Sequence, residues 1–123
     1  MLVELSIIPL GRGTHISDEI AEVLELIDAS GLPYQLTPSG TCIEGEWEEV
    51  MALVRRCHER ARARSSHVMT TIEIEDDGQA HDKLTRNVSS VEEKIGRRLG
   101  RFEREIPPAS SAAVAVGLTD APA

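Results

Sequence analysis

Residues 34–44, YQLTPSGTCIE, decide the fold because they predict two short strands joined by a tight turn. The runs 34–37 and 41–44 are rich in residues that favour strands, and Pro38-Ser39-Gly40 between them has the composition of a turn. Strands connected this closely pair antiparallel. The middle of the chain is therefore predicted to be a β-hairpin.

A strand and a helix are predicted before this hairpin. Residues 2–9, LVELSIIP, alternate apolar and polar side chains as a half-buried strand does, and Pro9 ends the run. Ser17 is predicted to cap a helix that stops at Gly31. The helix is indicated by apolar residues spaced three and four apart, which are Ile16, Ile20, Val23, Leu24 and Ile27.

A second helix and a fourth strand are predicted after the hairpin. The helix begins near Gly45, with acidic residues in its first turn and arginines at its end, which suits the helix dipole at both ends. Residues 68–75 then alternate as a strand. We expect the helix to bury a stripe made of Trp47, Val50, Met51, Val54, Cys57 and Ala61.

The predicted order is strand, helix, strand, strand, helix, strand. Right-handed crossovers and a central hairpin give an α+β, ferredoxin-like βαββαβ fold, with a four-stranded antiparallel sheet and both crossover helices on one face. An additional C-terminal helix should carry a narrow apolar seam that meets another helix or a partner subunit. The seam consists of Leu84, Val88, Val91, Ile95, Leu99, Phe102 and Ile106.

The length of 123 residues allows one domain, which we place at residues 1–106. Residues 107–123 have no periodic pattern and are predicted to be a flexible tail. Gly96 and Gly100 weaken the third helix, so fraying after about residue 95 is expected.

The formal net charge of −8 argues against nucleic acid and membrane surfaces as partners. Cys42 and Cys57 have no metal-ligand spacing, and we expect reduced thiols in a cytoplasmic protein. The four histidines lie on different predicted elements without a zinc motif. No sequence motif indicates catalysis, a metal site or a cofactor.

One group of residues on or beside the hairpin is a candidate binding site for a small ligand. Thr37, Ser39, Thr41 and Glu44 bring hydroxyls and a carboxylate close to Trp47, and ligand pockets combine a few polar groups with apolar walls. Glu44 is the strongest candidate, because a carboxylate can pair with a cation or accept from an amino group. The alternatives are a Glu44 that only complements a helix dipole and threonines that only suit an exposed strand.

Three segments resemble the thiamine-binding family of small ferredoxin-like proteins. They are residues 4–11 (ELSIIPLG), 31–41 (GLPYQLTPSGT) and 43–50 (IEGEWEEV), and they occur in order with matching intervals. The likeness spans about residues 2–95. The chain departs from the family's usual pattern at Asp76-Asp77 and at His67, where arginines are common.

This resemblance implies a non-enzymatic protein that binds thiamine or its hydroxymethylpyrimidine half. It also implies assembly into a homodimer or homotetramer through sheet faces and the last helix. The positions that match the family's motif for ligand binding are Ser6, Tyr34, Thr37, Thr41 and Glu44. Glu44 is expected to engage the pyrimidine ring, with the hydroxyls orienting it.

Two other functions stay open on the sequence. Dimeric ferredoxin-like proteins include isomerases and monooxygenases that act on the open face of the sheet, and similar folds sense metabolites. Enzymes of that kind usually need a histidine or arginine on this face. Here the face is predicted to carry Glu4, Ser6, Thr71 and Glu73.

Overall fold

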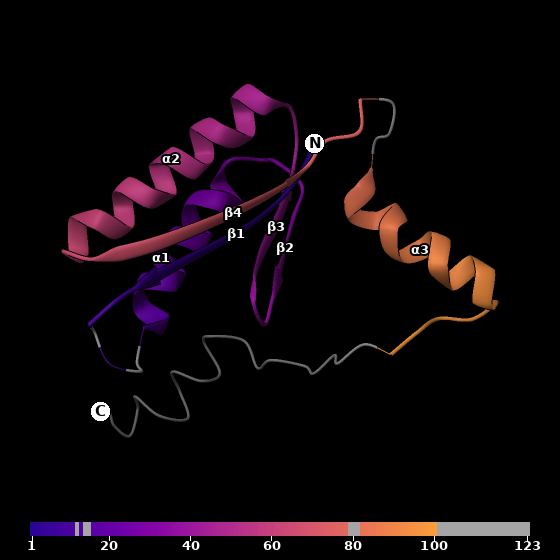
Figure 1. The fold of residues 1–123 in the computed structure, drawn as a ribbon, viewed down its shortest axis with the longest axis horizontal. Coiled ribbons are helices and arrows are strands. Elements are labelled where there is room, and N and C mark those ends of the chain that lie inside the picture. Colours follow the sequence, from indigo (N-terminus) through magenta and orange to yellow (C-terminus); the bar gives the residue numbers. More distant parts are fainter. Residues whose placement is uncertain (12, 14–15, 79–81, 101–123) are drawn as a thin grey trace, which may run out of the picture.

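The computed structural model describes residues 1–11, 13, 16–78 and 82–100. Its elements follow the predicted order (Figure 1), with an additional third helix. They are β1 (Leu2–Pro9), α1 (Ser17–Ala29), β2 (Tyr34–Thr37), β3 (Gly40–Glu44), α2 (Trp47–Arg64), β4 (Val68–Glu75) and α3 (Lys83–Ile95).

The four strands form one antiparallel sheet in the order β2-β3-β1-β4. Val3 pairs with Ile43 on one side and with Ile74 on the other, which sets these three side chains on the same face. Helices α1 and α2 lie together against that face, while α3 stands apart from them (Figure 1). The ferredoxin-like α+β fold predicted from the sequence is confirmed.

The core lies between the sheet and the two crossover helices. Its fully buried side chains include Val3 and Ile43 from the sheet, Ile27 from α1 and Leu53 from α2. Because few side chains are aromatic, this core consists of interlocking aliphatic residues.

Two local predictions are wrong. Trp47 is 50% exposed, since it is the first residue of α2, whereas Leu53, which was not assigned to the stripe, is fully buried. Ser17 is the first helical residue of α1 and not its cap; Ile16 occupies the cap position, without a side-chain hydrogen bond. The stripe predicted for α2 is otherwise present, with Val50, Val54, Cys57 and Ala61 buried and Met51 half-buried.

Helix α3 is attached to the face of the sheet opposite the core. The Glu44 carboxylate accepts hydrogen bonds from the backbone N–H groups of Lys83 (2.6 Å) and Leu84 (3.2 Å). The Lys83 ammonium donates to Glu75 at 2.9 Å, and this contact lowers the pKa of Glu75 and raises that of Lys83. Glu44 and Glu75 both pair with Leu2 in the sheet, so these contacts bridge one row across three strands.

The third helix is shorter than the predicted seam. It ends at Ile95, where Gly96 adopts a left-handed conformation (φ 84°), so Leu99 lies beyond the helix. Val88, Val91 and Ile95 are about half exposed, at 47%, 46% and 50%. Phe102, Ile106 and the predicted tail at 107–123 lie outside the described residues.

Truncation of Leu53 should destabilise the protein far more than truncation of Trp47. We expect Leu53→Ala to lower the free energy of unfolding by about 2–5 kcal/mol, because it leaves a cavity in the core. Trp47→Ala should cost less than half as much, since half of the side chain is already in water. Urea denaturation followed by circular dichroism measures both. Equal losses would contradict this description of α2.

Removal of the Glu44 carboxylate should loosen the first turn of α3. In Glu44→Ala the amide protons of Lys83 and Leu84 should exchange with solvent about tenfold faster or more. The reason is that both N–H groups lose their partly buried hydrogen bonds to the Glu44 carboxylate. Hydrogen exchange followed by NMR measures this. Glu73→Ala removes an exposed carboxylate of β4 and serves as the matched control, with no change expected at α3.

Candidate functional site

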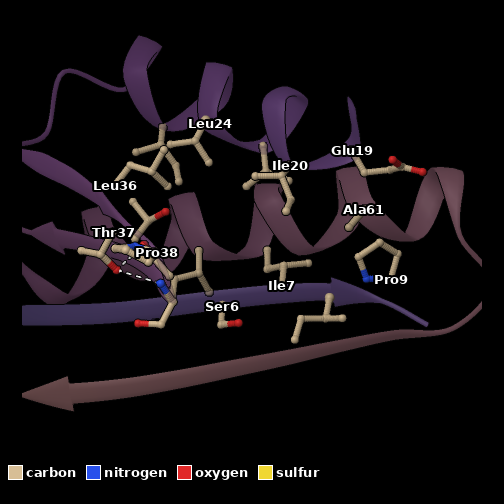
Figure 2. A pocket seen from close by; sticks show the side chains of 17 residues that line it. Ser6, Ile7, Pro9, Glu19, Ile20, Leu24, Leu36, Thr37, Pro38 and Ala61 are labelled. Atoms are coloured by element: carbon tan, nitrogen blue, oxygen red, sulfur yellow. Dashed lines mark hydrogen bonds between the residues drawn. The ribbon is translucent and has the colours of Figure 1, made fainter. Parts of the chain in front are cut away.

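A partly enclosed cavity of about 330 Å³ lies between α1, β1 and the β2–β3 hairpin (Figure 2). Ile20 and Leu24 of α1 form one wall, and Leu5 and Ile7 of β1 form the opposite one. This volume is at the lower end of the range of about 300–1,000 Å³ found for small-molecule sites.

The cavity exists because α1 packs on α2. Val23 and Ile27 of α1 are buried in the core beside Cys57, whose Sγ lies 4.0 Å from the Val23 carbonyl oxygen. Glu22 pairs with Arg60 and Arg64 of α2. These contacts hold α1 over α2 and leave the space above the hairpin end of the sheet unfilled.

Apolar side chains around this space are incompletely covered. Ile7, Ile20 and Leu24 are only half-buried, and Leu36 at the hairpin is 57% exposed. Exposed apolar surface gathered around a concave space is typical of a binding site, since a ligand can cover it.

A tight turn closes the hairpin end of the cavity. The Thr37 hydroxyl donates to the Gly40 carbonyl at 2.9 Å and accepts from the Ser39 N–H at 3.3 Å. A Cβ atom on Gly40 would lie 2.9 Å from the backbone oxygen of Leu5, so a glycine is needed for β3 to approach β1 this closely. The turn and this close approach of β3 to β1 fix the shape of the hairpin end of the cavity.

Thr41 is the predicted site residue that the structure places most favourably. It pairs with Leu5 on the helix-covered face, lines the cavity and is 4% exposed. It pairs with Leu36 of β2, so its hydroxyl belongs to the hairpin end of the cavity wall. A hydroxyl at this position can donate a hydrogen bond to a ligand or accept one from it.

Ser6 and Thr37 also border the cavity, but their hydroxyls are less available to it. Ser6 alternates with Leu5 and Ile7 along β1, and Figure 2 shows it on the other side of the strand from Ile7. The Thr37 hydroxyl is engaged within the turn. The structure thus brings Ser6, Thr37 and Thr41 together at one end of the cavity.

Tyr34 and Glu44, the other two predicted residues, do not line this cavity. The Tyr34 hydroxyl donates to Asp28 of α1 at 2.7 Å, and this hydrogen bond raises the pKa of Tyr34. It lies in a separate shallow hollow beside Leu24. Glu44 lies at the far end of β3, where it binds the backbone of α3.

Glu19 lines the cavity, and the sequence analysis did not single it out. It is 6% exposed and lies at the opposite end from Thr37 and Pro38, near Pro9 and Ala61 (Figure 2). Its sequence position in the first turn of a helix suggests only a partner for the helix dipole. Its burial follows from tertiary packing.

Among the described residues, the cavity lining is apolar apart from hydroxyls, backbone groups and one carboxylate, and none of these lining residues is a histidine, cysteine, lysine or arginine. Such a lining can hold a ligand through apolar contacts and hydrogen bonds. Burial raises the pKa of the Cys57 thiol to about 11, and burial also raises that of Cys42, so both thiols are protonated at neutral pH.

In the part of the chain that the structure describes, no three histidine, cysteine or acidic side chains are grouped so that they could hold a metal ion. None of the helices in the same residues has the length and apolarity required to cross a bilayer.

The fold is shared with solved structures of low sequence identity. A hypothetical protein from Methanocaldococcus jannaschii superimposes with a TM-score of 0.70 at 23% identity, covering 75% of this chain and 95% of the other. A Thermotoga maritima protein whose description names thiamine biosynthesis or salvage has a TM-score of 0.61 at 22% identity, covering 77% and 94%.

Sequence comparison gives closer relatives. A UPF0045 protein from Mycobacterium bovis is 36% identical over 98 residues, which are 79% of this chain and 96% of the relative. Another from Methanothermobacter thermautotrophicus is 37% identical over 95 residues, covering 75% and 96%. The model of the family described as "Thiamine-binding protein" matches residues 3–92, which include all of the sheet except Leu2 and most of α3. The chain belongs to the thiamine-binding protein family.

Proposed function

We propose that this protein binds thiamine or its hydroxymethylpyrimidine half in the cavity between α1 and the hairpin, and releases it unchanged. The observation that carries the proposal is a cavity of about 330 Å³ with apolar walls, which the nearly buried Thr41 lines with its hydroxyl-bearing side chain. Membership of the thiamine-binding family supports the identity of the ligand.

The walls of the cavity suit a flat heterocycle. Ile20 and Leu24 face the cavity from α1, and Ile7 lines it from β1, so a ring between them would cover apolar surface on both of its sides. Burial of this surface would drive binding at about 25 cal/mol per Å² before the cost of ordering the ligand is subtracted.

The polar end of the cavity suits the edge of an aminopyrimidine. Thr41 can donate one hydrogen bond and accept others, so it can pair with a ring nitrogen or with an exocyclic amino group. Ser39 adds a second hydroxyl at this end. The groups needed to orient a pyrimidine ring are therefore present.

Among the described residues, the cavity lining has hydroxyls and one carboxylate but no histidine, cysteine or lysine, and this composition supports binding without turnover. The description of the Thermotoga maritima protein, which names thiamine biosynthesis or salvage, fits a role in handling the same vitamin. We place this role in the cytoplasm, with the two thiols reduced.

We further propose that the protein works as a homodimer or homotetramer. Val88, Val91 and Ile95 form an apolar stripe on α3 that the described residues leave about half exposed. The outer face of the sheet adds Ile8 and Met69, which pair with each other across β1 and β4. A second copy of the chain could bury both surfaces.

Isothermal titration with thiamine and with hydroxymethylpyrimidine tests the ligand. We expect binding of at least one of them, and Thr41→Val should weaken it about three- to tenfold, because the variant keeps the shape but removes the hydrogen bond. Thr71→Val, on the exposed outer face, is the matched control. No heat with either compound would refute the ligand, and chromatographic detection of a product would refute binding without turnover.

Assembly is tested by a charge on α3. Val91→Asp places a carboxylate in the apolar stripe, so we expect a smaller particle mass by light scattering than for the unmodified protein. Glu93→Gln, a change at another exposed position of the same helix, should leave the mass unchanged. A Val91→Asp mass equal to that of the unmodified protein would show that α3 makes no subunit contact.

A further inference from the structure

Glu19 is the one ionisable residue among those that line the cavity in the described part of the chain. It is 6% exposed, although an isolated carboxylate is costly to bury. Glu19 has an interaction partner in the protein, but a carboxylate has about four acceptor positions and can serve a ligand as well.

The cavity therefore has two chemically different ends. Hydroxyl groups gather at the hairpin end, where Thr41 pairs with Leu36 close to Thr37. Glu19 lies at the other end of the cavity, near Pro9 and Ala61 (Figure 2). The space between the ends is lined by aliphatic side chains, which offer a ligand neither hydrogen bonds nor charge. A long ligand would thus meet hydroxyls at one end and negative charge at the other.

The neighbouring carboxylates of α1 do not share this position. Asp18 and Glu25 are exposed, and Glu22 pairs with arginines of α2. None of these three lines the cavity. Among the described residues that line the cavity, Glu19 is thus the one that brings a carboxylate, in a protein whose formal charge is −8.

From this arrangement we infer that Glu19 is a specificity-determining residue, which selects ligands that carry a positive charge at the end remote from the hairpin. The inference rests on the proposed function and deepens it. It orients thiamine with its aminopyrimidine towards Thr41 and its thiazolium ring towards Glu19. Attraction between unlike charges is strong in a cavity of low polarity, because little water screens it.

Three ligands separate the effect of the ligand's positive charge on affinity from the effect of its shape. Thiamine carries the thiazolium cation, deazathiamine has nearly the same shape with a neutral ring, and hydroxymethylpyrimidine lacks the second ring. Isothermal titration of the unmodified protein should show about tenfold tighter binding of thiamine than of deazathiamine. Equal affinities would overturn the inference without any variant.

Glu19→Gln then tests the residue itself, with Asp18→Asn as the control that removes an exposed carboxylate one position away. Glu19→Gln should weaken thiamine binding about tenfold and change the affinity for the two neutral compounds less than about twofold. Asp18→Asn should leave all three affinities unchanged. A uniform loss for all three ligands in Glu19→Gln would show a structural role and overturn the inference.

The same titrations distinguish a failure of the role assigned to Glu19 from a failure of the proposed function. If the unmodified protein binds thiamine but Glu19→Gln binds it equally well, the proposed function stands and the role of Glu19 is refuted. If the unmodified protein binds none of the three compounds, the proposed function fails, and the role of Glu19 fails with it.

Discussion

The contact between α1 and α2 is the constraint on which the rest of the structure depends. Val23 and Ile27 pack among the buried side chains of α2, and burial of each such aliphatic side chain contributes about 1.5–3 kcal/mol. The ion pairs of Glu22 with Arg60 and Arg64 lie at the rim of the same contact. Because α1 gains its burial from α2, it leaves the hairpin end of the sheet partly uncovered.

Most of the core lies outside the cavity, and only Leu5, Val23 and Ile27 of the core also line it. The fully buried core, with Ile43 and Leu53, is complete without any ligand. The half-buried side chains around the cavity form a second apolar surface that the protein itself does not cover. A ligand can therefore enter and leave without the core being taken apart.

The sequence was sufficient for the fold because each element has a local signal. Alternation predicts β1 and β4 with their observed bounds, and the turn residues before Thr41 predict the hairpin. Local signals failed at element ends. Trp47 follows the spacing of the buried stripe, yet its exposure depends on where α2 begins relative to the sheet.

The site was predictable only in part, for a related reason. The hairpin composition pointed to Thr41, which lines the cavity, and also to Glu44, which binds α3. Strand alternation puts these two residues on opposite faces of β3, but it does not reveal which face contains a cavity. Glu19 was missed because the first turn of a helix is usually exposed, and only the folded chain shows that Glu19 is buried at the cavity end near Pro9 and Ala61.

Strand β3 connects the cavity to α3 over only five residues. Gly40, its first residue, lines the cavity, and Glu44, its last, binds the backbone of α3. These two residues are about 13 Å apart along an extended chain. The same strand therefore contacts the cavity at one end and α3 at the other. Thermodynamic reciprocity then requires that any effect of ligand on the docking of α3 be matched by an equal effect of α3 docking on ligand affinity.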